Sequence, residues 1–274
     1  MNPIKMLALD LDDTVLRSDL TISYHTRNVI KKAEDAGVIV VLASGRVPAA
    51  MERFAHILGM DKRPGYLVCG NGTIVQESHT NNILHERHID EEVVLKVYDL
   101  VDAEGFPVQI YEEDCIYVSH QNEYTKHDEQ LSGMRQVVVE NFRGMMAAGN
   151  CHKIIIPGDP ALLVPLEKLL RNYLEDEATI FTSKPYLLEI LPAETNKGSA
   201  LAWIAEKIGI KREEVMAIGD SMNDEAMIRW AGTSVAMING DERIKSIAAI
   251  VTEKTNDEEG VAEIIEKYIL AKGA

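Results

Sequence analysis

The chain has 274 residues, of which 46% are hydrophobic, and a formal net charge of −16 at pH 7. This composition can fill the core of one large domain or two smaller ones, and the charge argues against nucleic acid and anionic membranes as partners. No apolar run approaches the ~18 residues of a membrane span, and early acidic residues interrupt any signal peptide. Three widely spaced cysteines without a CxxC pair favour a reducing compartment, so we predict a cytoplasmic protein.

The N-terminal part alternates between strand-like and helix-like patterns. Apolar, β-branched runs predict strands over residues 6–9, 38–43 and 66–69. A helix is predicted over residues 24–36, with Ser23 as its N-cap and Gly37 as its stop, and a second helix ends near residue 58. This order is typical of a parallel sheet covered by helices.

The middle of the chain has a different pattern, which predicts an inserted α/β domain. Helices are predicted near residues 91–103 and 161–173. The predicted strands are residues 108–111, 116–119, 153–156 and 187–191, the first two joined as a hairpin across residues 112–114. We place the inserted domain at residues 84–190 and the core domain at residues 1–83 and 191–274.

The C-terminal part returns to the style of the N-terminal part. It predicts a helix over residues 197–208, strands over 215–218, 234–237 and 249–252, and a final amphipathic helix over 258–270. Together the elements predict an α/β fold, a doubly wound, Rossmann-like parallel-sheet core with an inserted α/β domain.

Acidic residues follow the first predicted strand directly, in the order Asp10, Leu11, Asp12, Asp13, Thr14. Side chains alternate along an extended segment, so Asp10 and Asp12 project to the same side. Carboxylates at the end of a buried strand are costly unless a cation or hydrogen bonds compensate them, and a divalent metal ion is the simplest candidate. The alternative is a strand that runs into a plain acidic turn.

Two further segments offer groups for an anion. Ser44, Gly45 and Arg46 follow the second predicted strand, where a hydroxyl and backbone N–H groups at a helix start could hold a phosphate. Lys197 lies in the first turn of a helix, which is unfavourable for a cation unless an anion lies at the same end. The alternatives are a simple Ser-Gly turn and a solvent-exposed lysine.

The strand at residues 215–218 leads into the segment Gly219-Asp220-Ser221-Met222-Asn223-Asp224. A glycine for the turn, two acids and an amide suit Mg²⁺, which prefers a few carboxylate oxygens together with water and substrate phosphate. The alternative is that Asn223 or Asp224 only caps the next helix.

The four segments together resemble the signature of the haloacid dehalogenase superfamily, whose members transfer phosphoryl groups through an aspartate nucleophile. The pattern consists of Asp-x-Asp-x-Thr, a serine after the second strand, a distant lysine and Gly-Asp-x-x-Asn-Asp. The order and spacing fit across essentially the whole chain. The Asn-Lys-Gly form and the length of the insert resemble the Cof-type branch of bacterial sugar-phosphatase-like proteins.

The resemblance implies roles for the acidic residues. Asp10 would be the nucleophile that forms an aspartyl-phosphate, and Asp12 would protonate the leaving alcohol and later activate water. Mg²⁺ would be held by the Asp10 side chain, the Asp12 carbonyl and Asp220. Asp224 would support the metal site, and Asn223 would contact the phosphate or the metal shell.

The resemblance also implies a phosphate-binding set, Ser44, Gly45 and Lys197, with Asn223 beside it. Thr14 would satisfy backbone groups nearby. Asp13 stands where this branch often has glycine, and we interpret it as a residue of the turn.

Further residues are candidates for contact with the substrate. Arg46, Asn71 and Gly72 would form a substrate-facing rim, with plain surface roles as the alternative. The inserted domain would be a cap that closes over the site and sets specificity. His85 and His88 have a spacing that metals can use, but we interpret them as surface polar residues.

These implications predict a Mg²⁺-dependent phosphomonoesterase for small organic phosphate esters, with sugar phosphates first among them. A phosphomutase or phosphotransferase on the same core is the alternative enzyme. A phospho-accepting receiver-like protein is the alternative outside enzymes, although Asp12 and the cap oppose it. The sequence gives no indication of the oligomeric state.

Overall fold

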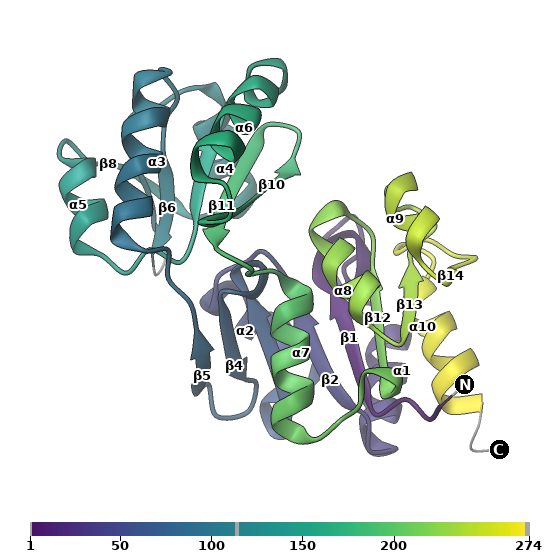
Figure 1. Cartoon of the computed structure of the whole chain (residues 1–274). Helices are drawn as coiled ribbons and strands as arrows, with labels where there is room; N and C mark the ends of the chain where they lie inside the picture. Colours follow the sequence, from purple (N-terminus) through teal and green to yellow (C-terminus); the bar gives the residue numbers. More distant parts are fainter. Residues whose placement is uncertain (1, 113–114, 272–274) are drawn as a thin grey trace. The chain divides into compact units, whose positions relative to one another are not determined.

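The computed structural model describes residues 2–112 and 115–271, which form two compact units. Unit 1 comprises Met1–His85 and Asn196–Ala274, and unit 2 is the intervening segment Glu86–Thr195 (Figure 1). The sequence analysis placed these divisions at residues 83/84 and 190/191. Residues 113 and 114 of the expected hairpin turn lie outside the described residues. Within the described part of the chain, no helix has both the length and the apolar character to cross a membrane.

Unit 1 is built on a sheet with the strand order β14-β13-β12-β1-β2-β3-β4-β5. The strands from β14 to β3 are parallel, and β4 is antiparallel to β3. The strands are β1 (Met6–Asp10), β2 (Ile39–Ala43), β3 (Gly65–Cys69), β4 (Ile74–Glu77), β5 (Ile83–Glu86), β12 (Val215–Gly219), β13 (Thr233–Ala236) and β14 (Ile250–Val251).

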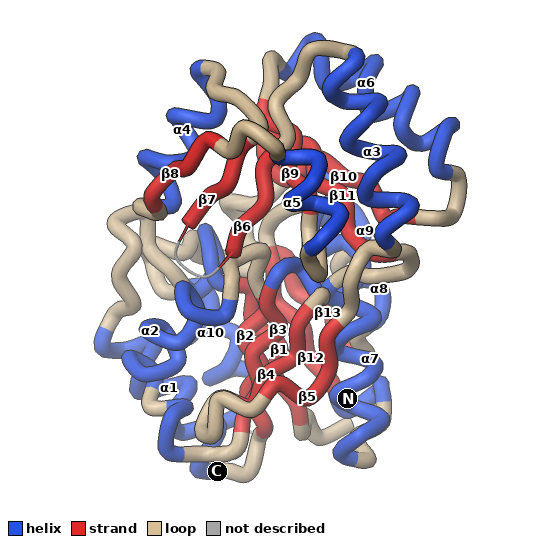
Figure 2. Tube along the Cα trace, turned by 90° about the vertical axis from the view of Figure 1, so that its left-hand side faces the viewer, coloured by secondary structure: helices blue, strands red, loops and turns tan. Residues whose placement is uncertain are grey.

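Helices cover both faces of this sheet, because its central strand is apolar on both sides. In β1, Leu7 and Leu9 enter one core cluster, and Met6 and Ala8 enter another. The first cluster lies under α1, α2 and α10, and the second under α7, α8 and α9 (Figure 2). The helices are α1 (Tyr24–Asp35), α2 (Pro48–Leu58), α7 (Lys197–Ile208), α8 (Glu225–Trp230), α9 (Glu242–Ile247) and α10 (Gly260–Ile265).

Unit 2 has its own sheet, with the order β10-β11-β9-β6-β7-β8. Its pairings are antiparallel except for the parallel pair β7 and β8. The strands are β6 (Gln109–Glu112), β7 (Cys115–Val118), β8 (Arg135–Val138), β9 (Ile154–Pro157), β10 (Ala178–Lys184) and β11 (Leu187–Pro192). The helices are α3 (Glu91–Ala103), α4 (Glu123–Ser132), α5 (Phe142–Ala148) and α6 (Pro160–Leu174).

One face of this second sheet is apolar. Ile110, Ile154 and Ile156 lie in the same core cluster as the buried side chains of α3, α5 and α6. The neighbouring positions Lys153 and Glu189 are also buried, and their side chains form an ion pair of 3.2 Å.

The predicted fold class is confirmed: a doubly wound parallel-sheet core carries an inserted α/β unit. The predicted helices over residues 91–103 and 197–208 have the bounds of α3 and α7. Six elements were not predicted, namely the strands β4, β5, β8 and β10 and the short helices α4 and α5. The final helix is shorter than predicted, because α10 ends at Ile265 and a wider helical turn, Glu266–Leu270, follows.

Candidate active site

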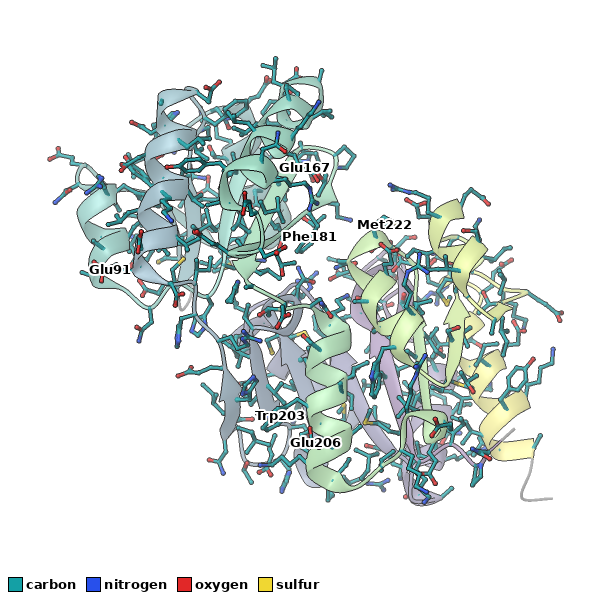
Figure 3. All side chains as sticks on the ribbon, viewed as in Figure 1. Glu91, Glu167, Phe181, Trp203, Glu206 and Met222 are labelled. Carbon is teal, nitrogen blue, oxygen red and sulfur yellow. The ribbon has the colours of Figure 1, made fainter. Side chains whose placement is uncertain are left out.

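The segments singled out in the sequence meet at one edge of the unit 1 sheet. Asp10 is the last residue of β1, Ser44 follows β2, and Asp220 follows β12. These strands are parallel neighbours, so their carboxyl ends lie side by side, where open α/β sheets bind ligands. In Figure 3, Met222 marks the turn after β12, and Trp203 marks α7.

The turn after β1 has an unusual backbone. Asp13 adopts a left-handed conformation with φ of 59°, which non-glycine residues rarely adopt and which Asp tolerates better than most. The carbonyl oxygen of Asp13 accepts a hydrogen bond of 2.9 Å from the Asn239 side chain. Thr14 is buried and donates its hydroxyl to Asp220 Oδ1 at 2.9 Å. The expectation that Thr14 serves backbone groups is therefore wrong: it joins the turn after β1 to the end of β12.

Lys197 is fully buried, so its interpretation as a solvent-exposed lysine is wrong. Its Nζ donates to Asp10 Oδ1 at 2.5 Å and to Asp224 Oδ1 at 2.6 Å. Asn196 holds the start of α7 in place, because its side chain accepts from Ser199 N while its own backbone N–H donates to Ser199 Oγ in a reciprocal cap. The helix start therefore delivers the ammonium into the acidic cluster.

The loop after β12 fixes two of the acids relative to each other. Asp224 is fully buried, and its Oδ2 accepts from the backbone N–H groups of Asp220 at 2.9 Å and Ser221 at 3.1 Å. A Cβ on Gly219 would lie 2.6 Å from the Asp224 carboxyl, so only glycine fits there. Asp224 thus does more than cap a helix, because one oxygen organises the loop and the other binds Lys197.

Asp10, Asp220 and Asp224 form a buried acidic cluster, in which one carboxylate oxygen of each residue lies within 4.8 Å of those of the other two. Burial and the neighbouring Asp224 raise the pKa of Asp10 well above its usual value, although Lys197 opposes them. Burial and Asp224 likewise raise the pKa of Asp220 to about 7. Burial opposes the charged form of Lys197, but Asp10 and Asp224 outweigh it and raise the pKa of this ammonium. Three acids thus face one buried lysine, so the cluster could accept further positive charge.

The second predicted catalytic acid, Asp12, lies beside this cluster and is partly exposed. Its carboxylate forms a bidentate pair with Arg46, at 2.9 Å from Nε and 2.7 Å from Nη2. Such a fork fixes the orientation of a carboxylate as well as its charge. The sequence analysis placed Arg46 on the substrate rim and did not foresee this pair.

The loops after β2 and β3 are joined, and this brings the remaining predicted residues together. Asn71 N donates to Ser44 O, and Gly70 N donates to Arg46 O, each at 2.9 Å. The buried Ser44 hydroxyl oxygen accepts from Arg46 N at 3.2 Å, which leaves its own O–H free to donate. Gly45 lies between them in the same loop.

Asn71 and Gly72 are buried, so a plain surface role is wrong for both. Asn71 Oδ1 accepts from Asn223 Nδ2 at 3.1 Å, and Asn223 Oδ1 accepts from Ser221 at 2.6 Å. Gly72 has φ of 109°, and a Cβ there would lie 2.4 Å from Asn196 O. The loop after β3 is thereby pressed against the start of α7.

Three contacts at the candidate site were missed by reasoning from the sequence. These are the Asp12–Arg46 pair, the Thr14–Asp220 bond and the Asn71–Asn223 bond. Each joins residues that lie at the ends of different strands. Strand order alone could have brought the loops together, but it does not specify which side chains pair.

A family model described as haloacid dehalogenase-like hydrolase matches residues 7–265. Among the similar proteins, the 5-amino-6-(5-phospho-D-ribitylamino)uracil phosphatase YcsE of Bacillus subtilis is 31% identical over 271 residues, with 97% of this chain and 96% of that protein covered. The HMP-PP phosphatase of Escherichia coli is 28% identical over 243 residues, with 88% and 87% covered.

A solved structure extends the similarity to three dimensions. The crystal structure of a haloacid dehalogenase-like hydrolase from Bacteroides thetaiotaomicron superposes with a TM-score of 0.85 at 33% identity. The match covers 96% of this chain and 99% of that chain. The likeness therefore includes both units and not the core sheet alone.

Proposed function

This chain belongs to the haloacid dehalogenase-like hydrolases, and from that premise we propose that it is a Mg²⁺-dependent phosphatase of small organic phosphate esters, sugar phosphates first among them. The relatives named as phosphatases support the reaction class. The observation that carries the proposal is the buried cluster of Asp10, Asp220 and Asp224 against the single ammonium of Lys197.

The donor set fits Mg²⁺, which takes oxygen ligands and is held by few carboxylates in phosphate-handling sites. Asp10, Asp220 and the carbonyl of Asp12 would hold the ion, and Asp224 would keep Lys197 and the loop in place. When bound, Mg²⁺ would neutralise the excess acid and offset the repulsion between Asp10 and an anionic substrate.

In the first half-reaction, a carboxylate oxygen of Asp10 attacks phosphorus, and the bond from phosphorus to the ester oxygen breaks. Asp12 gives its proton to that oxygen, which leaves as the alcohol. Lys197 binds Oδ1 of Asp10, which supports the assignment of the other oxygen as the nucleophile. The product is an aspartyl-phosphate at Asp10.

In the second half-reaction, Asp12 takes a proton from water, and the resulting hydroxide attacks phosphorus. The bond between phosphorus and Asp10 breaks, which releases inorganic phosphate and restores both acids. Arg46 would orient Asp12 through its bidentate pair, and one carboxylate oxygen would leave that pair to carry the proton in each transfer. The Ser44 hydroxyl, the Gly45 N–H and Lys197 would hold the oxygens of the transferring group, with Asn223 beside them.

We assign unit 2 the role of a cap that sets substrate specificity, and we assign Arg46, Asn71 and Gly72 to the lining of the site in unit 1. The Asn71–Asn223 bond supports this lining, because it joins the loop after β3 to the loop that carries the acids. The names of the relatives identify phosphorylated small molecules, which supports a small soluble ester as the substrate and not a macromolecule.

The test is phosphate release from a panel of sugar phosphates, nucleotides and cofactor phosphates, with Mg²⁺ and with EDTA. We expect release with Mg²⁺ only, and we expect Asp10→Asn to lower kcat by at least about 10³-fold because the nucleophile is lost. Asp13→Asn is the matched control, since it changes the neighbouring acid of the turn and Asn also tolerates the left-handed backbone.

Two results would contradict the proposal. Undiminished turnover by Asp10→Asn would remove Asp10 as the nucleophile. Transfer of the phosphoryl group to an added sugar, in place of release to water, would favour the phosphomutase or phosphotransferase.

A further inference from the structure

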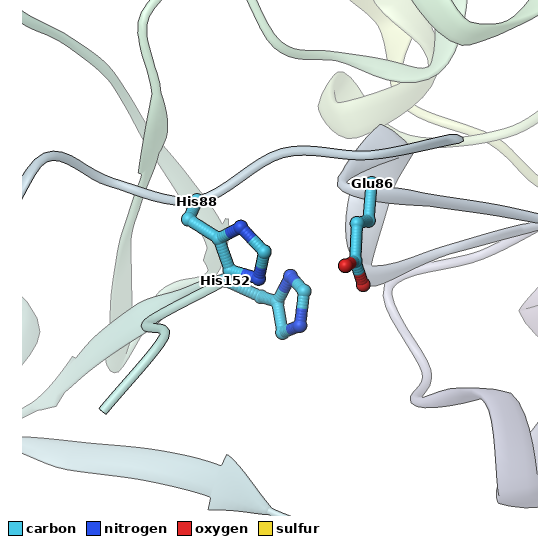
Figure 4. Close-up of side chains that lie close together, drawn as sticks. All are labelled: Glu86, His88 and His152. Carbon is cyan, nitrogen blue, oxygen red and sulfur yellow. The ribbon is translucent and has the colours of Figure 1, made fainter.

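A second group of side chains that could hold a metal ion lies at the beginning of unit 2, where β5 of the unit 1 sheet ends at Glu86. Glu86, His88 and His152 each offer one ligand atom, and these atoms lie within 4.8 Å of one another (Figure 4). The rings of His88 and His152 have centroids 4.2 Å apart and planes inclined by 36°. We call these three residues the histidine cluster.

The ring of His152 is oriented by the backbone. Its Nδ1 lies 3.1 Å from the carbonyl oxygen of Arg87. A carbonyl only accepts, so Nδ1 carries the hydrogen, and in the neutral ring Nε2 then has a free lone pair. Metal-binding histidines almost always donate their second nitrogen to a carbonyl or carboxylate in this way, which fixes both the tautomer and the ring.

The two chain segments that carry the cluster are held together independently of the side chains. Ile89 N donates to Cys151 O at 2.8 Å, next to the bond from His152 to Arg87. Cys151 itself is buried, and its thiol is directed at the carbonyl oxygen of Lys153 at 3.6 Å. The backbone therefore brings His88 and His152 together, while the neighbouring thiol is turned to another partner.

The chemistry of the cluster differs from that of the acidic cluster in unit 1. Two imidazole nitrogens and one carboxylate oxygen match the three-ligand sites of Zn²⁺, in which water takes the fourth position. Mg²⁺ and Ca²⁺ prefer sites made of oxygen alone. We propose that Glu86, His88 and His152 bind a Zn²⁺ ion.

The ion would cross-link unit 2. Glu86 and His88 lie at its beginning, and His152 lies just before β9, so the ion would tie the entering chain to the sheet. Ligand binding to the folded state alone stabilises that state. Zn²⁺ should therefore raise the melting temperature as well as bind.

The test uses the full chain, freed of metal and then saturated with Mg²⁺ so that the acidic cluster is occupied. Zn²⁺ is added, and the ¹⁵N resonances of the histidine rings report which nitrogens bind it. We expect Nε2 of His152 and one ring nitrogen of His88 to shift, and Nδ1 of His152 to stay protonated. This readout is independent of phosphatase activity, so it can fail or succeed whether or not the proposed reaction is correct.

Variants identify the ligands. We expect His88→Ala and His152→Ala to weaken Zn²⁺ binding by at least about 100-fold in calorimetry, and Glu86→Gln, at an exposed position, to weaken it about 10-fold without risk to the fold. His120→Ala is the matched control, because His120 is an exposed histidine of unit 2 outside the cluster. It should bind Zn²⁺ as the unaltered chain does.

Unmoved His88 and His152 resonances after one equivalent of Zn²⁺ would overturn the proposal. The proposal would also be overturned if the variants at positions 86 and 88 bound Zn²⁺ with an affinity within about threefold of that of the unaltered chain. A threefold ratio corresponds to less than about 1 kcal/mol of binding free energy.

Discussion

Lys197 joins the two parts of the acidic cluster, because one ammonium binds both Asp10, at the end of β1, and Asp224, beyond β12. The side chain is completely buried, so water does not share in this charge balance. Burying an ion pair is costly, but removing one partner is worse, because the remaining charges are left without compensation.

We therefore expect Lys197→Met to lower the free energy of unfolding by about 3–5 kcal/mol in the absence of Mg²⁺, since three buried acids lose their only described cation. The measurement is urea denaturation in EDTA. Lys207→Met, at an exposed position of the same helix, is the control and should cost less than about 1 kcal/mol, the value of its contact with the Trp203 ring. Equal losses in the two variants would contradict the importance of the pair.

At the scale of elements, the loop between β12 and α8 depends on the lack of a side chain at Gly219. The space for a Cβ is filled by the Asp224 carboxyl at 2.6 Å. That carboxyl cannot move freely, because two backbone N–H groups and Lys197 hold it. A small change in the strand end would thus displace an acid of the cluster.

We expect Gly219→Ala to cost about 1–3 kcal/mol of unfolding free energy and to weaken Mg²⁺ binding, because the added methyl group must push Asp224 away. Denaturation with and without Mg²⁺ measures both effects. Gly149→Ala is the control, since its Cβ would meet only an ordinary contact at 3.5 Å and should change stability by less than about 0.5 kcal/mol. A Gly219→Ala variant as stable as this control would show that the loop adapts.

Sequence reasoning succeeded where one physical signal was strong. The buried strands β1, β2 and β12 are apolar runs, α3 has a clear apolar periodicity, and α7 begins with a capping box. Strands β4 and β5 were missed because they are short and carry polar residues such as Gln76 and His85. Strand β10 was missed because most of its residues are only half-buried and its pattern is mixed.

The same contrast holds for the candidate site. The acids were found because carboxylates at the ends of apolar strands are conspicuous. The hydrogen-bond partner of each acid was not found, because Asp12 and Arg46 are 34 residues apart in the sequence and Thr14 and Asp220 are 206 residues apart. His88 was considered with His85, which is close to it in sequence, whereas in the structure His85 stacks on Trp203 and His88 lies beside His152 with its ring tilted. Spacing along the chain does not specify such pairings.

At the scale of the whole molecule, the acidic cluster couples folding to pH. The pKa of Asp220 is about 7 in the folded chain, against an ordinary value of 3.8. At a pH between these two pKa values, Asp220 stays protonated in the folded chain and loses its proton in the unfolded chain. The contribution of Asp220 to stability therefore falls as pH rises. The raised pKa of Asp10 acts in the same direction.

We expect the rise in melting temperature caused by Mg²⁺ to be small near pH 5 and to grow to the order of 5 °C by pH 8, because the ion competes with these protons. Thermal unfolding with Mg²⁺ and with EDTA across this range measures the difference. Burial also raises the pKa of Glu34 to about 7, but Glu34 is outside the cluster, so Glu34→Gln should shift both curves alike. A Mg²⁺ effect that is constant with pH would contradict the coupling.

The division of unit 1 into two stretches of chain has a consequence for protein synthesis. Strand β1 pairs with β2 on one side. On its other side it pairs with β12, which is synthesised only after the whole of unit 2. On the ribosome, unit 2 is complete before the central sheet can close. Until then β1 presents an unpaired apolar edge, the kind of edge that seeds aggregation. A nascent chain stalled after Thr195 would thus be a natural client of chaperones, with the acids that end β1 still lacking their lysine.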